Sequence, residues 1–307
     1  MGCCLPLSLI GKIDCKQSGV RAVRFNVDGN YCMTCGADKT VKLWNPYKQI
    51  LLKIYTGTGW EILDAQSSSD NSSILAGGLD KQLTIFDVET GKITRRWRGH
   101  SGKVNCVAFN EESNVALSGS QDGIVRCFDV RDKSGPIQVL DEAADAVLSI
   151  DVCAHQIASG SADSNVRIYN IREGKMSMDF VGDSATSVTF SGDSQCILVS
   201  TKDGFVRLLD NNNGKLLADY TGHMNNEYRI ESRILSTEAH VLSGSEDGKV
   251  YIWDLIHMSL LHRLVHPDRI IHSVSVHPTK PFFLSASSST IFFWGISETE
   301  TVIKANS

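Results

Sequence analysis

The residues that could bind a metal or perform catalysis are scattered along this sequence. Cys32 and Cys35 have the spacing of a zinc knuckle or a redox pair. They fall within an expected strand, where side chains three positions apart point to opposite faces. Five histidines between positions 257 and 277 match no helical or paired-cysteine zinc pattern, and we expect them on the surface and in turns. The sequence predicts no metal site and no bound cofactor.

Catalytic motifs are not recognisable either. His100 and His223 each follow a glycine, and an imidazole could serve as a general base. The chain has no phosphate loop, no Gly-x-Ser-x-Gly elbow and no Gly-x-Gly-x-x-Gly after a strand. We therefore expect that the protein is not an enzyme and that these two histidines have structural roles.

A short pattern recurs seven times: small residues, a turn usually centred on Asp, a strand that alternates apolar and polar residues, and a closing aromatic or apolar residue. The turn residues are spaced by 42, 42, 41, 40, 44 and 41 positions, and they are Asp38, Asp80, Asp122, Asp163, Asp203, Asp247 and Ser288. This period matches the blades of WD repeats. Blades in a ring bury their apolar faces against one another, so the sequence predicts an all-β, seven-bladed WD-repeat β-propeller.

The last blade lacks one strand within its own repeat. Too few residues follow Trp294 to form an outer strand, whereas the segment 7–13 precedes the first repeat. We predict that this N-terminal strand closes the last blade. The predicted propeller spans residues 7–296, between tails at 1–6 and 297–307.

The sixth repeat is the most complete. Its tetrad predicts a buried hydrogen-bond chain from the indole through Ser and His to the turn carboxylate. The four residues are His223, Ser243, Asp247 and Trp253.

Partner proteins should bind on the loops, because the strands are needed for the fold. The relevant face carries the loops between blades and the Asp turns. Its candidate residues are Trp60, Glu61, Lys103, Gln121, Asp145, Lys202, Tyr228, Arg229, Glu246 and Arg269. Trp, Tyr and Arg are frequent hot-spot residues. The stretch 224–229 is two residues longer than its counterpart in the third repeat, and it is the preferred local candidate.

Charge and cysteine content indicate the cellular compartment and the kinds of partner to expect. Thirty basic and 35 acidic residues give a net charge of −5, so no overall field favours nucleic acid or anionic lipid. Nine cysteines are too few for a disulfide scaffold, and residues 1–15 lack the features of a signal peptide. Gly2, Cys3 and Cys4 suggest lipidation, but Pro6 stands where Ser or Thr is favoured. We expect a protein of the cytoplasm and nucleus without a membrane anchor.

Two strand ends suggest a different binding function. Phe128-Asp-Val-Arg131 and Tyr169-Asn-Ile-Arg172 resemble the Trp-Asp-x-Arg box of propellers that are substrate receptors of cullin-type ubiquitin ligases. In that interpretation Arg131 and Arg172 contact the ligase adaptor. The simpler interpretation is an exposed arginine after each strand.

Several segments resemble one particular group of WD-repeat proteins. They include residues 20–46, 98–105, 222–228 and 245–250, and they are similar to the mitogen-activated protein kinase organiser family. The resemblance implies a scaffold for the extracellular signal-regulated kinase cascade that is also a component of the catalytic spliceosome. It implies kinase-cascade and spliceosomal proteins as partners, and we expect a monomeric propeller within larger complexes. The Cys-rich start, 1–6, departs from the Pro-rich leader of that family.

Overall fold

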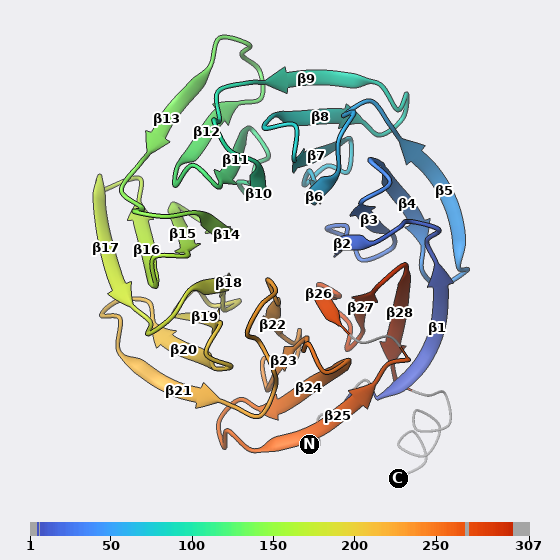
Figure 1. Cartoon of the computed structure of the whole chain (residues 1–307), viewed down its shortest axis with the longest axis vertical. Coiled ribbons are helices and arrows are strands. Elements are labelled where there is room, and N and C mark those ends of the chain that lie inside the picture. Colours follow the sequence, from blue (N-terminus) through green and yellow to red (C-terminus); the bar gives the residue numbers. More distant parts are fainter. Residues whose placement is uncertain (1–4, 6, 268–269, 297–307) are drawn as a thin grey trace.

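The strands of the chain form seven antiparallel four-stranded sheets arranged as the blades of a ring (Figure 1). The computed structural model describes residue 5, residues 7–267 and residues 270–296. Strands are the only regular secondary structure in these residues, and none of them forms a helix long and apolar enough to cross a membrane. The predicted all-β, seven-bladed propeller is confirmed.

The first four blades each take four consecutive strands. Blade one contains β2 (Val20–Phe25), β3 (Cys32–Gly36), β4 (Val41–Asn45) and β5 (Ile50–Tyr55). Blade two contains β6 (Ile62–Ser67), β7 (Ser73–Gly78), β8 (Leu83–Asp87) and β9 (Ile93–Trp97). Blade three contains β10 (Val104–Phe109), β11 (Val115–Ser120), β12 (Val125–Asp129) and β13 (Pro136–Leu140). Blade four contains β14 (Val147–Cys153), β15 (Gln156–Ser161), β16 (Asn165–Asn170) and β17 (Lys175–Phe180).

The last three blades complete the ring. Blade five contains β18 (Ala185–Phe190), β19 (Cys196–Thr201), β20 (Val206–Asp210) and β21 (Leu216–Tyr220). Blade six contains β22 (Ser232–Ile234), β23 (His240–Ser243), β24 (Lys249–Asp254) and β25 (Leu260–Val265). Blade seven contains β26 (Ile271–Val276), β27 (Phe283–Ser287), β28 (Thr290–Gly295) and the N-terminal strand β1 (Ser8–Asp14).

Strand β1 closes the ring, as predicted. It pairs antiparallel with β28, with Ser8 opposite Gly295 and Asp14 opposite Thr290. Its Ile13 is buried in the core between blades seven and one, together with Ile291. The two ends of the propeller are therefore held in one sheet. Residues 1–4, 6 and 297–307, which include Gly2, Cys3, Cys4 and most of both predicted tails, lie outside the described residues.

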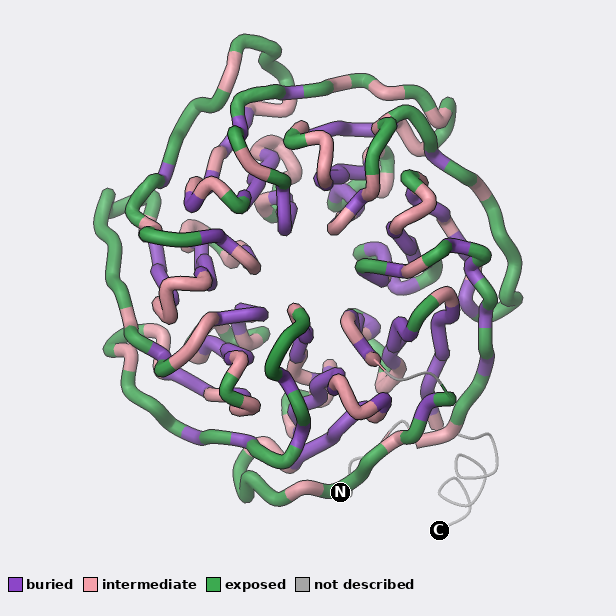
Figure 2. Tube along the Cα trace, in the orientation of Figure 1, coloured by how far each residue is buried: buried purple, intermediate pink, exposed green. Residues whose placement is uncertain are grey.

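The hydrophobic core lies between neighbouring blades. Each of seven clusters in the described chain joins the facing sides of two blades; one of them packs Met33 and Tyr55 of blade one against Ile74 and Phe86 of blade two. Buried residues concentrate on the inner strands, whereas the outer strands and loops are largely exposed (Figure 2). A single blade would leave its core uncovered, so each blade depends on its neighbours.

The structure corrects the predicted hydrogen-bond chain of blade six. The indole of Trp253 donates to the carbonyl of Thr221 at 3.1 Å, and the Ser243 hydroxyl donates to the carbonyl of Gly244 at 3.0 Å. Tyr251 and Lys249 both donate to one oxygen of Asp247 at 2.8 Å, and the ring of Tyr251 stacks on Trp253. His223 is buried with neither ring nitrogen hydrogen-bonded within the described chain, and burial lowers its pKa to about 4.

Blade three forms the chain that blade six lacks. His100 contacts the Ser118 hydroxyl through Nε2 at 2.8 Å and Asp122 through Nδ1 at 3.0 Å. Burial opposes ionisation of Asp122, but hydrogen bonds from the Ser101 amide and from His100 outweigh it and lower the pKa of Asp122 to about 2. Phe128 closes this strand, so no indole extends the chain.

Blade seven contains a chain that sequence reasoning missed. The Trp294 indole donates to the Ser285 hydroxyl at 2.9 Å, and His266 Nε2 lies 2.7 Å from the same oxygen. His266 and His277 lie in connections between strands, as expected for turn histidines, but both are buried, which the sequence did not predict. His266 follows Val265 rather than Gly, which concealed its equivalence to His100.

Cys32 and Cys35 lie on opposite faces of β3. Cys32 packs in the core between blades seven and one, and Cys35 packs in the core between blades one and two. Burial raises the pKa of both thiols, which makes each a poor ligand or nucleophile. Within the described residues no three His, Cys, Asp or Glu side chains gather at a distance suited to a metal ion.

Candidate protein-binding site

The loops of one face surround a cavity of about 400 Å³ at the mouth of the central channel. Six of the ten predicted binding residues line it, and they come from the loops of several different blades. These six are Glu61, Lys103, Gln121, Lys202, Tyr228 and Arg229. The cavity is thus assembled from residues that are far apart in the sequence.

Regular β-bulges direct further side chains into this cavity. In six of the described blades the innermost strand changes register near its start, for example between Val20 and Ala22 of β2. A bulge leaves one residue unpaired and re-aims its side chain. Arg21, Asn105 and His272 occupy the bulges of blades one, three and seven and line the channel mouth. Sequence reasoning missed these residues, although each is the second residue of its strand.

The lengthened loop before β22 is held in a defined conformation by Glu246. One carboxylate oxygen of Glu246 accepts hydrogen bonds from the backbone amides of Asn226, Glu227 and Tyr228 at 2.8, 2.8 and 2.9 Å. Partial burial opposes ionisation of Glu246, but these bonds outweigh it and lower its pKa. Glu246 therefore positions the loop, and its carboxylate is occupied by the protein itself.

The same loop is anchored below by Asn225. The Asn225 side chain is fully buried and donates to the Thr186 hydroxyl at 3.1 Å and to the carbonyl of Thr201 at 3.0 Å. Tyr228 stays 39% exposed, and its ring lies against His272 with centroids 5.4 Å apart. A rigid, partly exposed aromatic side chain can bind a partner at a low entropic cost.

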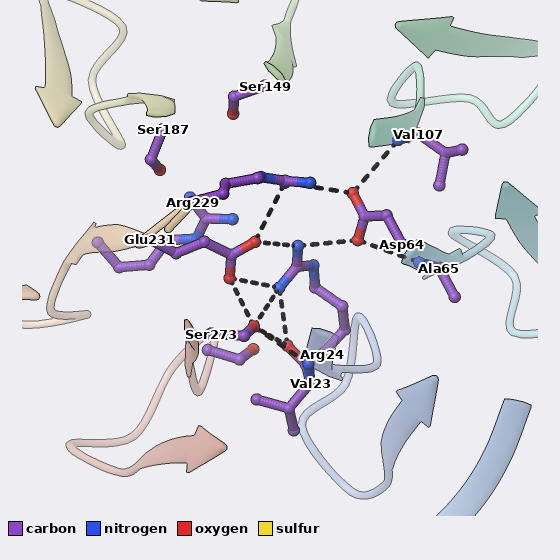
Figure 3. A network of polar contacts seen from close by, with 12 residues as sticks. Val23, Arg24, Asp64, Ala65, Val107, Ser149, Ser187, Arg229, Glu231 and Ser273 are labelled. Carbon is purple, nitrogen blue, oxygen red and sulfur yellow. Dashed lines mark hydrogen bonds and ion pairs between the residues drawn. The ribbon is translucent and has the colours of Figure 1, made fainter. Parts of the chain in front are cut away.

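A charged network fills the channel beneath the loop (Figure 3). Arg24 contacts Glu231 at 2.6 and 2.8 Å and Asp64 at 2.8 Å. Arg229 lies 3.2 Å from Glu231, and its guanidinium also donates to the carbonyl of Asn105 across the channel. Two arginines and two carboxylates thus join blades one, two and six and connect blade six to blade three.

The network is balanced in charge, and its two carboxylates are nearly closed to solvent. The side chains of Asp64 and Glu231 are only 5% and 4% exposed. Burial alone would disfavour the charged form of Glu231, but Arg24 and Arg229 hold its pKa well below the usual range. Asp64 and Glu231 raise the pKa of Arg24 despite its burial. The charged forms of Glu231 and Arg24 are therefore stabilised by each other, and the main role of the network is to organise the channel.

Side-chain oxygens on the innermost strands also connect neighbouring blades. Each binds a backbone amide of the next inner strand, a group that would otherwise lack a partner at the sheet edge. The pairs are Asp64 with Val107, Ser149 with Val188, Ser187 with Ser232 and Ser273 with Val23, at 3.1–3.4 Å.

Comparison with known proteins places the chain in a family. Over 291 residues it is 48% identical to WD repeat domain-containing protein 83 of Rattus norvegicus, covering 94% of this chain and 92% of that protein. The chain belongs to this WD-repeat family. It is 47% identical over 292 residues to the protein of the same name from Danio rerio, covering 95% and 93%. A Dictyostelium discoideum homolog is 31% identical over 324 residues, covering 94% and 99%.

Two family models agree with the WD-repeat assignment. The model of the WD domain, G-beta repeat, matches residues 7–45, 214–254 and 258–295. The model of the nucleolar protein 10-like N-terminal domain matches residues 32–232. Neither description names a catalytic activity, and the WD-repeat fold is generally a non-catalytic interaction scaffold.

The remaining predicted binding residues lie apart from the cavity lining. Trp60 is 61% exposed on the loop between blades one and two, where Lys39 lies over its ring at 6.0 Å from the centroid. Asp145 is exposed and accepts a bond from the adjacent backbone amide. Arg269 falls outside the described residues. That these residues and the cavity bind protein remains a prediction.

Arg131 and Arg172 lie on the other face of the ring. Both are exposed, in turns that follow β12 and β16 of the adjacent blades three and four. Their position is compatible with either interpretation given to them, because an exposed arginine at a strand end needs no partner within the chain.

Proposed function

We propose that this WD-repeat protein is a non-catalytic scaffold that binds partner proteins at the channel mouth. The observation that carries the proposal is the loop held by Glu246 and Asn225, which presents Tyr228 in a fixed position beside the cavity. Lys103 and Lys202 line the same cavity and take part in no ion pair within the described chain. They provide positive charge for an acidic group of a partner.

The partners that we propose are components of a mitogen-activated protein kinase cascade and of the catalytic spliceosome. The family membership and the resemblance of residues 20–46 and 222–228 to the kinase organiser family support this choice. We propose that the monomeric propeller acts in the cytoplasm and the nucleus, without direct binding to nucleic acid or membrane.

Affinity purification from both compartments tests this function. The intact chain is compared with a variant in which Trp60, Lys103 and Tyr228 are changed to alanine, since these side chains are exposed and none belongs to the buried network. Mass spectrometry should identify kinase-cascade or spliceosomal proteins with the intact chain, and the variant should lose them.

A control variant carries the same number of changes on the outer strands. Ile137, Met176 and Leu216 are 59%, 42% and 48% exposed on β13, β17 and β21, and their change to alanine should retain every partner. Loss of the same partners from both variants would contradict binding at the channel mouth, as would their retention by the first variant.

The second candidate function is that of a substrate receptor for a cullin-type ubiquitin ligase. The exposure of Arg131 and Arg172 on two adjacent blades favours it. Co-purification with the ligase adaptor, abolished when both arginines are changed to alanine, would support this function. Absence of the adaptor from purifications that contain other partners would exclude it.

A further inference from the structure

A second cavity, of about 300 Å³, lies between blades one and two on the face opposite the channel mouth. Its walls come from the turns β2–β3, β6–β7 and β8–β9 and from the strands beside them. None of the residues predicted to bind partners lines it. Its apolar lining residues are Tyr31, Met33, Leu43, Leu52, Ile74 and Val88.

The side-chain amides of the two asparagines in the lining are already hydrogen-bonded within the protein. Asn26 donates to Asn71 at 2.9 Å and accepts from the backbone amide of Tyr31 at 2.9 Å. Asn71 in turn donates to Asp28 at 2.7 Å. Their amide groups are thus bound within the protein, so an incoming group gains most by burying apolar surface.

The rim of this cavity is acidic. Asp28, Asp70 and Glu89 are exposed, and each contacts or directly adjoins a lining residue. Hydrogen bonds from Ser68 and Ser72 lower the pKa of Asp70, which keeps it charged. The ammonium of Lys53 donates to the carbonyls of Val88 and Glu89 and so faces the backbone.

We propose that this cavity binds an aromatic side chain flanked by lysine or arginine, carried by an extended segment of a partner protein. Its volume is at the lower limit of binding pockets, which suits one ring rather than a whole ligand. The aromatic side chain buries its surface against the exposed Tyr31 and Leu52 above the buried Met33, and the flanking cations lie beside the acidic rim. Since the site leaves the channel mouth free, the scaffold can hold two proteins at once.

Methionine methyl groups report on both faces separately. Met33 lines the cavity, whereas Met224 is 48% exposed on the loop at the channel mouth. The full chain, labelled with ¹³C in its methionine methyl groups, is titrated with the peptide Gly-Ser-Lys-Trp-Lys-Ser-Gly and followed by NMR. The Met33 signal should shift and saturate with a dissociation constant below about 1 mM, while the Met224 signal stays in place.

Two control peptides define the chemistry. Replacing Trp by Ala should abolish the shift of the Met33 signal, and replacing both Lys by Glu should weaken binding at least about tenfold at low salt, because the acidic rim would repel it. If the Trp peptide at several times about 1 mM causes no shift of the Met33 signal, the proposal is overturned. Equal binding of the Glu peptide would also overturn it.

A matched pair of variants locates the site. Leu52 and Leu217 are 48% and 47% exposed at equivalent positions of the outer strands β5 and β21. Leu52→Asp should abolish the shift of Met33, and Leu217→Asp should leave it unchanged. If both variants lose the peptide-induced shift of the Met33 signal, or if neither loses it, the location of the site between blades one and two is contradicted. If Leu52→Asp fails to fold, the peptide series with the unmodified chain decides. Failure of this site leaves the proposed binding at the channel mouth untouched, since the variant of Trp60, Lys103 and Tyr228 tests that binding separately.

Discussion

Replacing Glu231 by Gln tests the charged network directly. The Glu231 carboxylate contacts Arg24, Arg229 and the Ser273 hydroxyl, and its side chain is only 4% exposed. The change keeps the shape of the side chain but leaves two partly buried guanidiniums facing one buried carboxylate, Asp64. Removing one partner of a buried ion pair costs about 3–5 kcal/mol. We expect a loss of that size in the free energy of unfolding.

Urea unfolding followed by tryptophan fluorescence measures this loss. The control is Glu227→Gln, which alters an exposed carboxylate in the adjacent loop and should change the free energy of unfolding by less than about 0.5 kcal/mol. A loss below about 1 kcal/mol for Glu231→Gln would show that Arg24 finds other partners or water, and the proposed role of the network would be wrong.

Three further predictions concern stability. Because His223 has a folded pKa of about 4, below the value of about 6.5 in an unfolded chain, the unfolded state binds more protons between these limits. The free energy of unfolding should therefore fall by on the order of 3 kcal/mol as the pH drops through this window, and His223→Phe should remove that part of the pH dependence in urea titrations. Trp253→Ala should cost about 3–5 kcal/mol, whereas Trp60→Ala should cost less than about 0.5 kcal/mol in the same assay; an unchanged melting temperature for Trp253→Ala would contradict the burial of this indole. Removing residues 1–14 deletes β1 and exposes the edge of β28, so melting temperature should fall and aggregation by gel filtration should rise; a stable monomer would refute ring closure by β1.

The fold could be predicted because its signals are local and repeated. Each Asp turn and each alternating strand can be recognised from a few consecutive residues. Seven copies at one period then indicate a seven-bladed propeller. Closure by β1 followed from the shortage of chain after Trp294. In each case the pattern lies along the chain and does not depend on distant contacts.

The predicted tetrad of blade six failed in a blade whose side chains around the turn Asp differ from those of other blades. Blades one, three, four and five carry a Lys or Arg two places before the closing residue, and it pairs with the turn Asp, as Arg167 does with Asp163 at 2.7 Å. Blade six has Tyr251 at this place; its hydroxyl and Lys249 bind one oxygen of the Asp247 carboxylate, and His223 makes no hydrogen bond to Asp247 within the described chain. This arrangement depends on side-chain geometry that the repeat pattern does not contain.

The candidate site was predicted in part. Loop position alone identified Tyr228 and Lys103, which line the channel mouth. The network beneath them joins Arg24 to Asp64, 40 residues away, and to Glu231, 207 residues away. Only closure of the ring brings such residues together, so no local pattern indicates them. The bulge residues, such as His272, were identifiable by their repeat position.

Site-specific crosslinking tests most directly whether partners bind at the channel mouth. A photo-crosslinking phenylalanine derivative replaces Tyr228, or, as control, Met176 on the outer strand β17, which is similarly exposed at 42% against 39%. Irradiation in cells and mass spectrometry of the products should yield kinase-cascade or spliceosomal proteins at position 228 and not at position 176. The same proteins at both positions, or at position 176 alone, would contradict binding at the channel mouth.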